Sequence, residues 1–285
     1  MSFDVSHPEV QAAIERALAE DIGSGDITTN LCVPPDAIAT GRLVARQDLI
    51  LAGVELLHPV FEQVAERVAS GPCDVSLRCC SGAHLMDGSE IAVVRGPARV
   101  LLTAERTALN FLQRLSGVAT QAHAYVSAIK GTESKILDTR KTTPGLRLLE
   151  KMAVAAGGAT NHRAGLFDAI LIKNNHISAA GGVCAALERT REASVPVEIE
   201  VRSKEELDEA LAAGAKHLLL DNLTPAVARE WITYIAGRAT VELSGGISLE
   251  TVRAFAESGA DFISIGAITH SAPAVDINFR LEMDA

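Results

Sequence analysis

The chain has 285 residues, of which 48% are hydrophobic and 22% charged, and its formal net charge is −10. The length is enough for one large domain or two modest ones, each with a buried core. The acidic balance excludes a general affinity for nucleic acid or anionic membrane, because either partner requires a broad basic face. Any anion site must therefore be local.

The N-terminal stretch has no basic leader followed by an apolar core, and no run of about 18 uncharged apolar residues occurs. We therefore expect a cytoplasmic protein. The five cysteines show no CxxC spacing, which predicts reduced thiols rather than a zinc site or a disulfide framework.

The first part of the chain reads as short strands separated by turns. Residues 41–53, 74–80 and 90–102 form aliphatic or β-branched runs bounded by Gly, Pro or Asp. This pattern predicts a small α/β sandwich. Thr103 then has the position of an N-cap, and apolar residues recur at helical spacing up to Leu115, so we expect one long helix or a broken pair.

From about Lys135 onward, short apolar strands alternate with amphipathic helices. The predicted strands are residues 135–138, 168–173, 197–201, 217–221, 240–244 and 262–266. Ser203 and Thr224 have the positions of helix N-caps. Apolar strands covered by helices imply a parallel sheet. Six strands without an obvious seventh and eighth predict an open, incomplete α/β barrel, with a doubly wound sheet as the alternative.

Polar and charged residues follow the predicted strand ends, where parallel α/β folds bind their ligands. These residues are Asp138, Arg140, Lys141, Lys173, Asn174, His176, Glu200, Asp221, Ser244, Gly245, Gly246 and Gly266. A single polar strand end is explained by solvent exposure. Six in succession, with this many fixed charges, favour a binding site.

Cations are concentrated between residues 138 and 176, where six of them stand against three carboxylates. Arg147 and Lys151 are four residues apart on a predicted helix, and an exposed face or pairing with Glu150 explains them equally well. Arg140, Lys141, Arg163 and Lys173 lie at or beside strand ends. Guanidinium groups suit carboxylate or phosphate, so the pattern predicts a polyanionic substrate.

Two glycine-containing segments follow the last two predicted strands. Ser244–Gly245–Gly246 precedes a helix expected to begin near Ser248, and residues 264–271 repeat that arrangement. Either segment alone is more often a simple turn. Together they predict paired phosphate-binding loops whose backbone N–H groups face the anion.

Glu200 and Asp221 end adjacent predicted strands. Two carboxylates among cations can ligate Mg²⁺, contact sugar hydroxyls, or stabilise positive charge that develops at an anomeric carbon. The competing interpretation is an ion pair with Lys173 or Arg140.

Several segments together resemble the quinolinate phosphoribosyltransferase family, the carboxylating nicotinate-nucleotide pyrophosphorylases. The segments are EDIGSGDITT, ERTALNFLQRLSG, DTRKTTPGLR, EKMAVAAGGATNHRAGLFDAILIKNNHI, VEIEV, LLLDN, VELSGGI and GAITHSAPAVDINF. The resemblance runs nearly end to end. It implies an α/β sandwich over residues 1–112, joined by a C-terminal tail at 274–285, and an open α/β barrel over residues 113–273.

The resemblance also implies roles for individual residues. Family substrate-binding positions match Arg106, Thr139, Arg140, Lys141, His162, Arg163, Lys173, Glu200 and Asp221, of which Lys141, Lys173, Glu200 and Asp221 are expected to be catalytic. Phosphate-binding positions match Ser244, Gly245, Gly246, Ile265, Gly266 and Ala267. Arg106 matches an arginine that family members donate across a homodimer, which in turn can assemble further.

The implied reaction joins quinolinate and phosphoribosyl pyrophosphate to give nicotinate mononucleotide, pyrophosphate and CO₂ in NAD biosynthesis. Mg²⁺ is expected on the diphosphate, with Glu200 and Asp221 as its candidate protein ligands. The family commonly has an acidic residue where this chain has Asn174, which puts a metal or lysine-orienting role of that position in doubt. The roles of His162 and His176 stay open between ligand contact and loop ordering.

Three alternatives remain at this point. A lyase or aldolase of the phosphate-binding barrel class would use Lys141 or Lys173 as a Schiff-base amine. A paralogue associated with molybdenum transport shares the fold. A non-catalytic sensor of pyridine carboxylates would keep the arginines but would not need both carboxylates and both phosphate loops.

Overall fold

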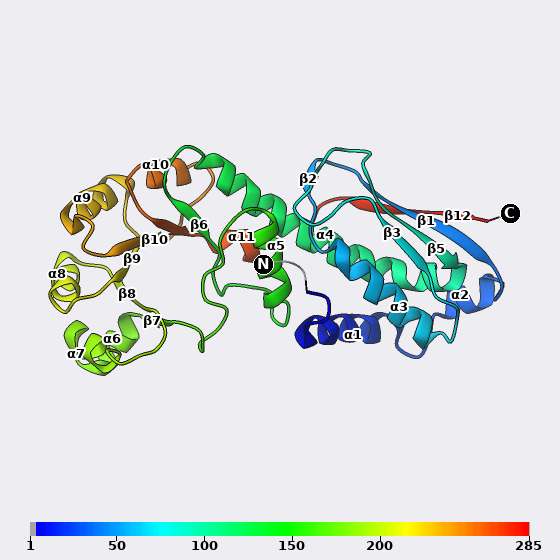
Figure 1. The fold of residues 1–285 in the computed structure, drawn as a ribbon, viewed down its shortest axis with the longest axis horizontal. Coiled ribbons are helices and arrows are strands. Elements are labelled where there is room, and N and C mark those ends of the chain that lie inside the picture. The colour runs from blue at the N-terminus through cyan, green and yellow to red at the C-terminus, as the bar shows by residue number, and fades with distance from the viewer. Residues whose placement is uncertain (1–3, 285) are drawn as a thin grey trace. The chain divides into compact units, whose positions relative to one another are not determined.

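The computed structural model describes residues 4–284, which divide into two compact units (Figure 1). The first unit contains the described residues up to 123, together with 143–158 and those from 271 onward. The second unit contains residues 124–142 and 159–270. Helix α4, Ala98–Ala128, begins in the first unit and its last residues belong to the second. The predicted boundary between residues 112 and 113 falls inside this helix.

The first unit is built on a four-stranded sheet with the order β12-β1-β5-β3. Its strands are β1 Ile38–Ala45, β3 Asp74–Leu77, β5 Glu90–Pro97 and β12 Ile277–Met283, and all neighbouring pairs are antiparallel. Alternate residues of β1 are buried, as expected where one face of the sheet covers a core. A short pair, β2 Leu49–Ile50 with β4 His84–Leu85, is separate from this sheet.

The helices of the first unit supply most of its apolar core. They are α1 Pro8–Ile22, α2 Ile27–Cys32, the short 3-10 helix η1 Val54–Leu56, α3 Leu57–Arg67, the larger part of α4, and α5 Arg147–Ala156. Ile14 and Leu18 of α1, Phe61 of α3, and Leu101 and Leu112 of α4 are all fully buried. Burying side chains of this size stabilises by about 1.5–3 kcal/mol each relative to exposure.

Helix α4 begins earlier than the sequence pattern indicated. Its first residue is Ala98, so the predicted strand end at residues 98–102 and the predicted N-cap at Thr103 are both wrong. The helix is also continuous rather than a broken pair. Leu101, Ala104 and Ala108 are buried at helical spacing, and this burial outweighs the β-propensity of the valine before them. The Thr103 hydroxyl donates instead to Asp26 Oδ2 at 3.1 Å.

The charged residues of α5 do not form an exposed face. Lys151 is 2% exposed and Glu150 0%. Glu150 accepts hydrogen bonds from Arg114 Nη2 at 2.7 Å and from the Thr143 hydroxyl at 2.7 Å. The exposed-face interpretation of Lys151 is therefore wrong. The neighbouring carboxylate, Glu150, is bound by an arginine far away in the sequence, a contact that helical spacing cannot reveal.

The second unit contains six parallel strands in the order β6-β11-β10-β9-β8-β7. They are β6 Lys135–Leu137, β7 Ile170–Ile172, β8 Val197–Val201, β9 His217–Asp221, β10 Thr240–Ser244 and β11 Phe262–Ser264. All six predicted strands are confirmed. Within the described residues, the edge strands β6 and β7 do not pair with each other, so the predicted α/β fold with an open parallel sheet is confirmed and no closed barrel is formed.

Helices alternate with these strands in Figure 1. They are α6 Asn174–Ala180, α7 Val183–Arg189, α8 Lys204–Ala212, α9 Pro225–Ile235, α10 Val252–Ala256 and α11 Ala267–His270. The predicted N-caps are confirmed, because Ser203 accepts the Glu206 N–H at 3.2 Å and Thr224 accepts the Val227 N–H at 3.4 Å. Across the described part of the chain, no helix combines the length and apolar character needed to cross a bilayer.

Candidate functional site

A cavity of about 260 Å³ lies at the carboxyl ends of the parallel strands in the second unit. Its lining includes nine of the predicted site residues, namely Thr139, Arg140, Lys141, His162, Arg163, Lys173, Glu200, Asp221 and Ser244. Leu171, Leu219, Glu242 and Ser264 complete the lining. All six strands contribute to it, because the carboxyl ends of parallel strands meet at one edge of a sheet.

Four cations share this cavity, namely Arg140, Lys141, Arg163 and Lys173. Within the described structure, the Nε of Arg140 is buried and has no hydrogen-bond partner. Arg163 Nη1 donates to the Ala169 carbonyl at 2.9 Å. The pKa of the Arg163 guanidinium is lowered, mainly by burial and to a smaller extent by repulsion from Arg140. A buried donor without an acceptor is destabilising, so these guanidinium groups are arranged for an anion that enters the cavity.

Three acidic residues line the same cavity as the cations, and two of them, Glu200 and Asp221, are the predicted carboxylates. Glu200 is buried at the end of β8, and its Oε2 lies 3.5 Å from Lys173 Nζ. Asp221 ends β9, and its Oδ2 accepts a hydrogen bond from Asn222 Nδ2 at 2.5 Å. The ion pair anticipated between Glu200 and Lys173 is therefore formed. The cavity combines anion-binding groups with two carboxylates able to face a sugar or a cation.

Sequence reasoning missed two glutamates beside His162. The Nε2 of His162 lies 3.3 Å from Glu198 Oε2 and 3.5 Å from Glu242 Oε2. The pKa of the Glu242 carboxyl is raised to about 7, mainly by burial and to a smaller extent by repulsion from Glu198. The signal was present in the sequence, because residues two apart on a strand share a face and Glu198 therefore lies on the same side of β8 as Glu200.

The cluster of His162, Glu198 and Glu242 has a spacing that could hold a metal ion. The hydrogen bonds argue against that use. His162 Nδ1 accepts the backbone N–H of Arg163 at 2.7 Å, which assigns the ring hydrogen to Nε2. An Nε2–H group donates to the carboxylates and offers no lone pair to a metal, so His162 acts here as a hydrogen-bond donor.

The two predicted phosphate loops differ in their surroundings. Gly266 directly precedes α11, and an added Cβ there would lie 2.9 Å from Lys141 Cδ. The loop after β10 does not lead at once into a helix, because α10 begins at Val252 rather than near Ser248. The Ser248 N–H instead donates to the Thr251 hydroxyl at 3.0 Å, and this local turn delays the helix.

The remaining predicted residues lie outside the cavity lining. Ser244 reaches it, whereas Gly245, Gly246, Ile265, Gly266 and Ala267 do not. Arg106 is an exposed residue of α4 in the first unit. Asn174 begins α6, and His176 Nδ1 accepts the Lys173 N–H at 2.9 Å, so His176 orders the start of this helix.

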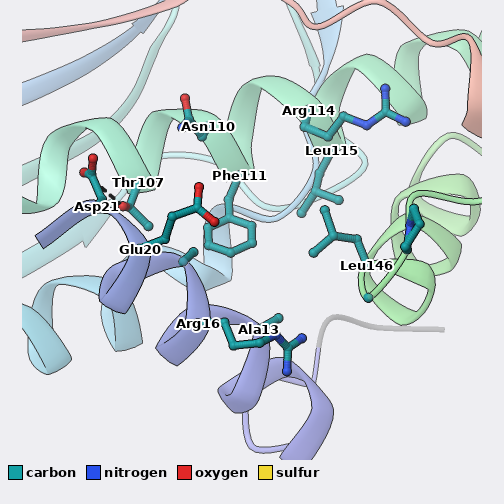
Figure 2. Close-up of a pocket in the computed structure, with 13 residues that line it drawn as sticks. Ala13, Arg16, Glu20, Asp21, Thr107, Asn110, Phe111, Arg114, Leu115 and Leu146 are labelled. Atoms are coloured by element: carbon teal, nitrogen blue, oxygen red, sulfur yellow. Dashed lines mark hydrogen bonds between the residues drawn. The ribbon is translucent and has the colours of Figure 1, made fainter. Parts of the chain in front are cut away.

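The first unit contains a larger cavity, of about 360 Å³, shown in Figure 2. Its charged lining residues are Arg16, Glu20, Asp21 and Arg114. Phe111 lies in the middle of the view, and the Thr107 hydroxyl donates to Asp21 at 3.5 Å. The cations are matched by carboxylates, and Arg114 is already bound to the buried Glu150. This cavity therefore has no excess of positive charge for a polyanion.

Two family models match the chain. Residues 26–116 match the N-terminal domain of quinolinate phosphoribosyl transferase, and residues 118–280 match its C-terminal domain.

Individual proteins are similar over almost the whole chain. A nicotinate-nucleotide pyrophosphorylase (carboxylating) of Mycobacterium leprae is 43% identical, over 99% of this chain and 100% of that protein. A probable enzyme of the same name from Bacillus subtilis is 40% identical, over 98% and 96%. The crystal structure of NadC from Streptococcus pyogenes has a TM-score of 0.93 at 38% identity and covers 100% of both chains.

Proposed function

The chain belongs to the quinolinate phosphoribosyl transferase family, and we propose that it transfers a phosphoribosyl group from phosphoribosyl pyrophosphate to quinolinate. The products are nicotinate mononucleotide, pyrophosphate and CO₂, which makes the chain a pentosyltransferase of de novo NAD biosynthesis. The lyase and sensor alternatives lose their support, because the two family models match most of the chain.

One observation supports this proposal most strongly, namely a single cavity that combines four cations with three acidic residues, Glu200, Asp221 and Glu242. Quinolinate carries two carboxylates, and phosphoribosyl pyrophosphate carries a 5-phosphate and a diphosphate. The buried and unpartnered Nε of Arg140 gives such a ligand a donor that the free protein leaves unused. Glu200 and Asp221 would have no use in a site that only binds anions.

In the proposed complex, quinolinate lies against the arginines. Arg140 and Arg163 hold its carboxylates, since a planar guanidinium pairs with a carboxylate through two parallel hydrogen bonds. Lys141 and Lys173 lie toward the boundary between the pyridine and the diphosphate. Thr139 belongs to the same wall, and His162 donates its Nε2–H within the glutamate cluster.

The transfer step requires no covalent nucleophile from the protein. The ring nitrogen of quinolinate attacks C1 of the ribose, and the bond from C1 to the pyrophosphate oxygen breaks. Positive charge develops on the ribose, and Glu200 and Asp221 stabilise it electrostatically. Holding both reactants in line contributes roughly 7–11 kcal/mol through positioning alone.

Loss of CO₂ follows from the same step. Once the ring nitrogen is quaternised it can accept the electron pair that departing CO₂ leaves at C2, and a proton then takes that position. The arginines that hold the carboxylates also fix the orientation of the ring. The backbone N–H groups of Ser244–Gly246 and of Ile265–Ala267 are assigned to the phosphate groups.

Mg²⁺ fits this site through the carboxylates. The ion prefers oxygen ligands and is usually held by one or two carboxylates together with substrate phosphates. Glu200 and Asp221 offer such oxygens on the cavity wall, whereas the His162 cluster does not fit for the tautomeric reason given above. When bound, the ion neutralises charge on the leaving diphosphate. Lys173 Nζ lies 3.5 Å from Glu200 Oε2 and gives that carboxylate a cationic partner.

We assign Arg106 to the active site of a partner subunit in a homodimer, where it adds a further guanidinium for quinolinate. Its exposed position on α4 is compatible with this role. The net charge of −10 is compatible with work in the cytoplasm without nucleic acid or membrane as partners.

Release of labelled CO₂ from carboxyl-labelled quinolinate tests the proposed function. The reaction is run complete, without phosphoribosyl pyrophosphate, and without Mg²⁺, and nicotinate serves as the control substrate. We expect release only from the complete mixture and no nucleotide from nicotinate. Folded protein that releases no CO₂, or that converts nicotinate equally well, would contradict the proposal.

A further inference from the structure

Asp138 is a buried carboxylate directly after β6, one residue before Thr139 of the cavity wall. It is 0% exposed and is not among the residues that line the cavity. A buried carboxylate is strongly destabilising unless hydrogen-bond donors or cations surround it. The donors that Asp138 has recruited therefore indicate what it holds in place.

Both carboxylate oxygens of Asp138 bind the neighbouring segment, residues 160–163. Oδ1 accepts the backbone N–H of His162 at 2.7 Å, and Oδ2 accepts from Asn161 Nδ2 at 2.9 Å. The Asp138 N–H also donates to the Thr160 carbonyl at 3.2 Å. Apart from one bridge between Leu137 and Thr160, the segment has no regular structure of its own. These hydrogen bonds therefore join it to the end of β6.

The segment carries one of the two arginines assigned to quinolinate. Arg163 follows His162 directly, and Arg140 lies two residues after Asp138. The two guanidinium groups line the same cavity and repel each other, which contributes to the lowered pKa of Arg163. Bringing two like charges together requires a fixed backbone. The hydrogen bonds between Asp138 and segment 160–163 supply that constraint.

We propose that Asp138 is a positioning residue that holds segment 160–163 against the end of β6, so that Arg163 and Arg140 converge on one dianion. The inference rests on the proposed function, in which these arginines bind the carboxylates of quinolinate. Asp138 itself does not touch the substrate. Its loss should therefore affect quinolinate more than phosphoribosyl pyrophosphate.

The decisive variant is Asp138→Asn, because it keeps the size of the side chain. An amide has one acceptor oxygen, so its NH₂ group faces either the His162 N–H or Asn161 Nδ2, and that hydrogen bond is lost. We expect the KM for quinolinate to rise about 10- to 100-fold and the KM for phosphoribosyl pyrophosphate to change by less than about threefold. Unfolding is followed in parallel by thermal denaturation.

The double variant Asp138→Asn/Asn161→Asp exchanges the two side chains. The amide oxygen at position 138 can then accept from the His162 N–H, while the amide NH₂ group donates to the new carboxylate at position 161. We expect this exchange to restore most of the quinolinate affinity, because the hydrogen bonds that join position 138 to segment 160–163 are formed again.

A matched control is Asp261→Asn, because Asp261 Oδ2 accepts the Val241 N–H at 2.8 Å just before β11, away from the carboxyl ends of the strands. This change is expected to alter stability without altering the KM for quinolinate. If Asp138→Asn does not fold, Asn161→Ala replaces it, since that change removes the hydrogen bond from Asn161 Nδ2 to Asp138 and should still raise the KM severalfold.

Three results would overturn the positioning role. The first is a wild-type KM for quinolinate in folded Asp138→Asn, and the second is a wild-type KM in folded Asn161→Ala. The third is a folded double variant whose KM for quinolinate is raised as much as that of Asp138→Asn. Quinolinate binding measured by calorimetry on the same variants tests the role independently of turnover. If the wild-type protein is inactive, the proposed function is refuted. If the wild type is active and Asp138→Asn behaves like it, only the role of Asp138 is refuted.

Discussion

Replacing Arg140 by alanine removes the group on which the anion site most depends. Its Nε is buried and has no hydrogen-bond partner, so the free protein already tolerates an unsatisfied donor that a carboxylate can complete. Losing a charge-assisted hydrogen bond of this kind costs about 3 kcal/mol, which corresponds to roughly a 150-fold rise in the KM for quinolinate. Stability should change little, because no hydrogen bond of that nitrogen is lost.

The assay is CO₂ release at varied quinolinate with phosphoribosyl pyrophosphate held at saturation. Arg140→Lys should be intermediate, because it keeps the charge but loses the planar fork. Arg191→Ala is the matched control, since its side chain is 75% exposed and pairs only locally with Glu188 at 3.1 Å. A folded Arg140→Ala protein with the quinolinate KM of the wild type would refute the assignment of this arginine.

Three further predictions concern groups around the site and the first unit. Because the pKa of Glu242 is raised from 4.5 to about 7, the unfolded state ionises first, and wild-type stability should fall as pH rises from about 4.5 to 7. Glu242→Gln should lose this decrease in stability, which is measured as the difference in unfolding free energy between pH 5 and pH 7.5 by denaturant titration. The same difference in the wild type and the variant would contradict the prediction. Gly245→Ala should reduce CO₂ release at least tenfold, on the order of 1.4 kcal/mol. Gly245 has a φ of +101°, and an added Cβ would lie 2.6 Å from the Asn222 N atom. Wild-type activity of this variant would contradict the close packing. Glu150→Ala should lower the unfolding free energy by about 2–3 kcal/mol in a urea titration, because the partly buried Arg114 loses its fully buried carboxylate partner. A loss below about 1 kcal/mol would match an exposed pair and contradict this prediction.

Much of the second unit was predictable because its signals are local. Each strand is a short apolar run with a polar end, and the parallel arrangement brings those ends together without any long-range information. Arg140, Lys173, Glu200 and Asp221 could therefore be placed in one site from the sequence.

The errors share a dependence on contacts between distant residues. Thr103 reads as an N-cap, but the burial of Leu101 in the first unit extends the helix back to Ala98. Helical spacing allowed an exposed face or a pair with Glu150 for Lys151, but Lys151 is buried and Glu150 is bound by Arg114 from another helix. Helical spacing and propensity describe one element at a time, so they cannot report a partner that the fold brings from elsewhere.

The buried glutamates show a different failure. Glu242 lies inside an apolar strand, where a carboxylate contradicts the strand pattern unless the site requires it. That contradiction was a usable signal. Its meaning became clear only with the structure, because the proximity of Glu198 and His162 depends on how the fold brings β8 and β10 to segment 160–163, which lies between α5 and β7.

The most direct test of the central claim is to follow each carboxylate of quinolinate separately. Quinolinate labelled at the C2 carboxyl and quinolinate labelled at the C3 carboxyl are incubated with phosphoribosyl pyrophosphate and Mg²⁺, and CO₂ and the nucleotide product are measured together. The account predicts that only the C2 label appears as CO₂, in equal amount to nicotinate mononucleotide that retains the C3 label. Release of the C3 label, or nucleotide formation without CO₂, would contradict it.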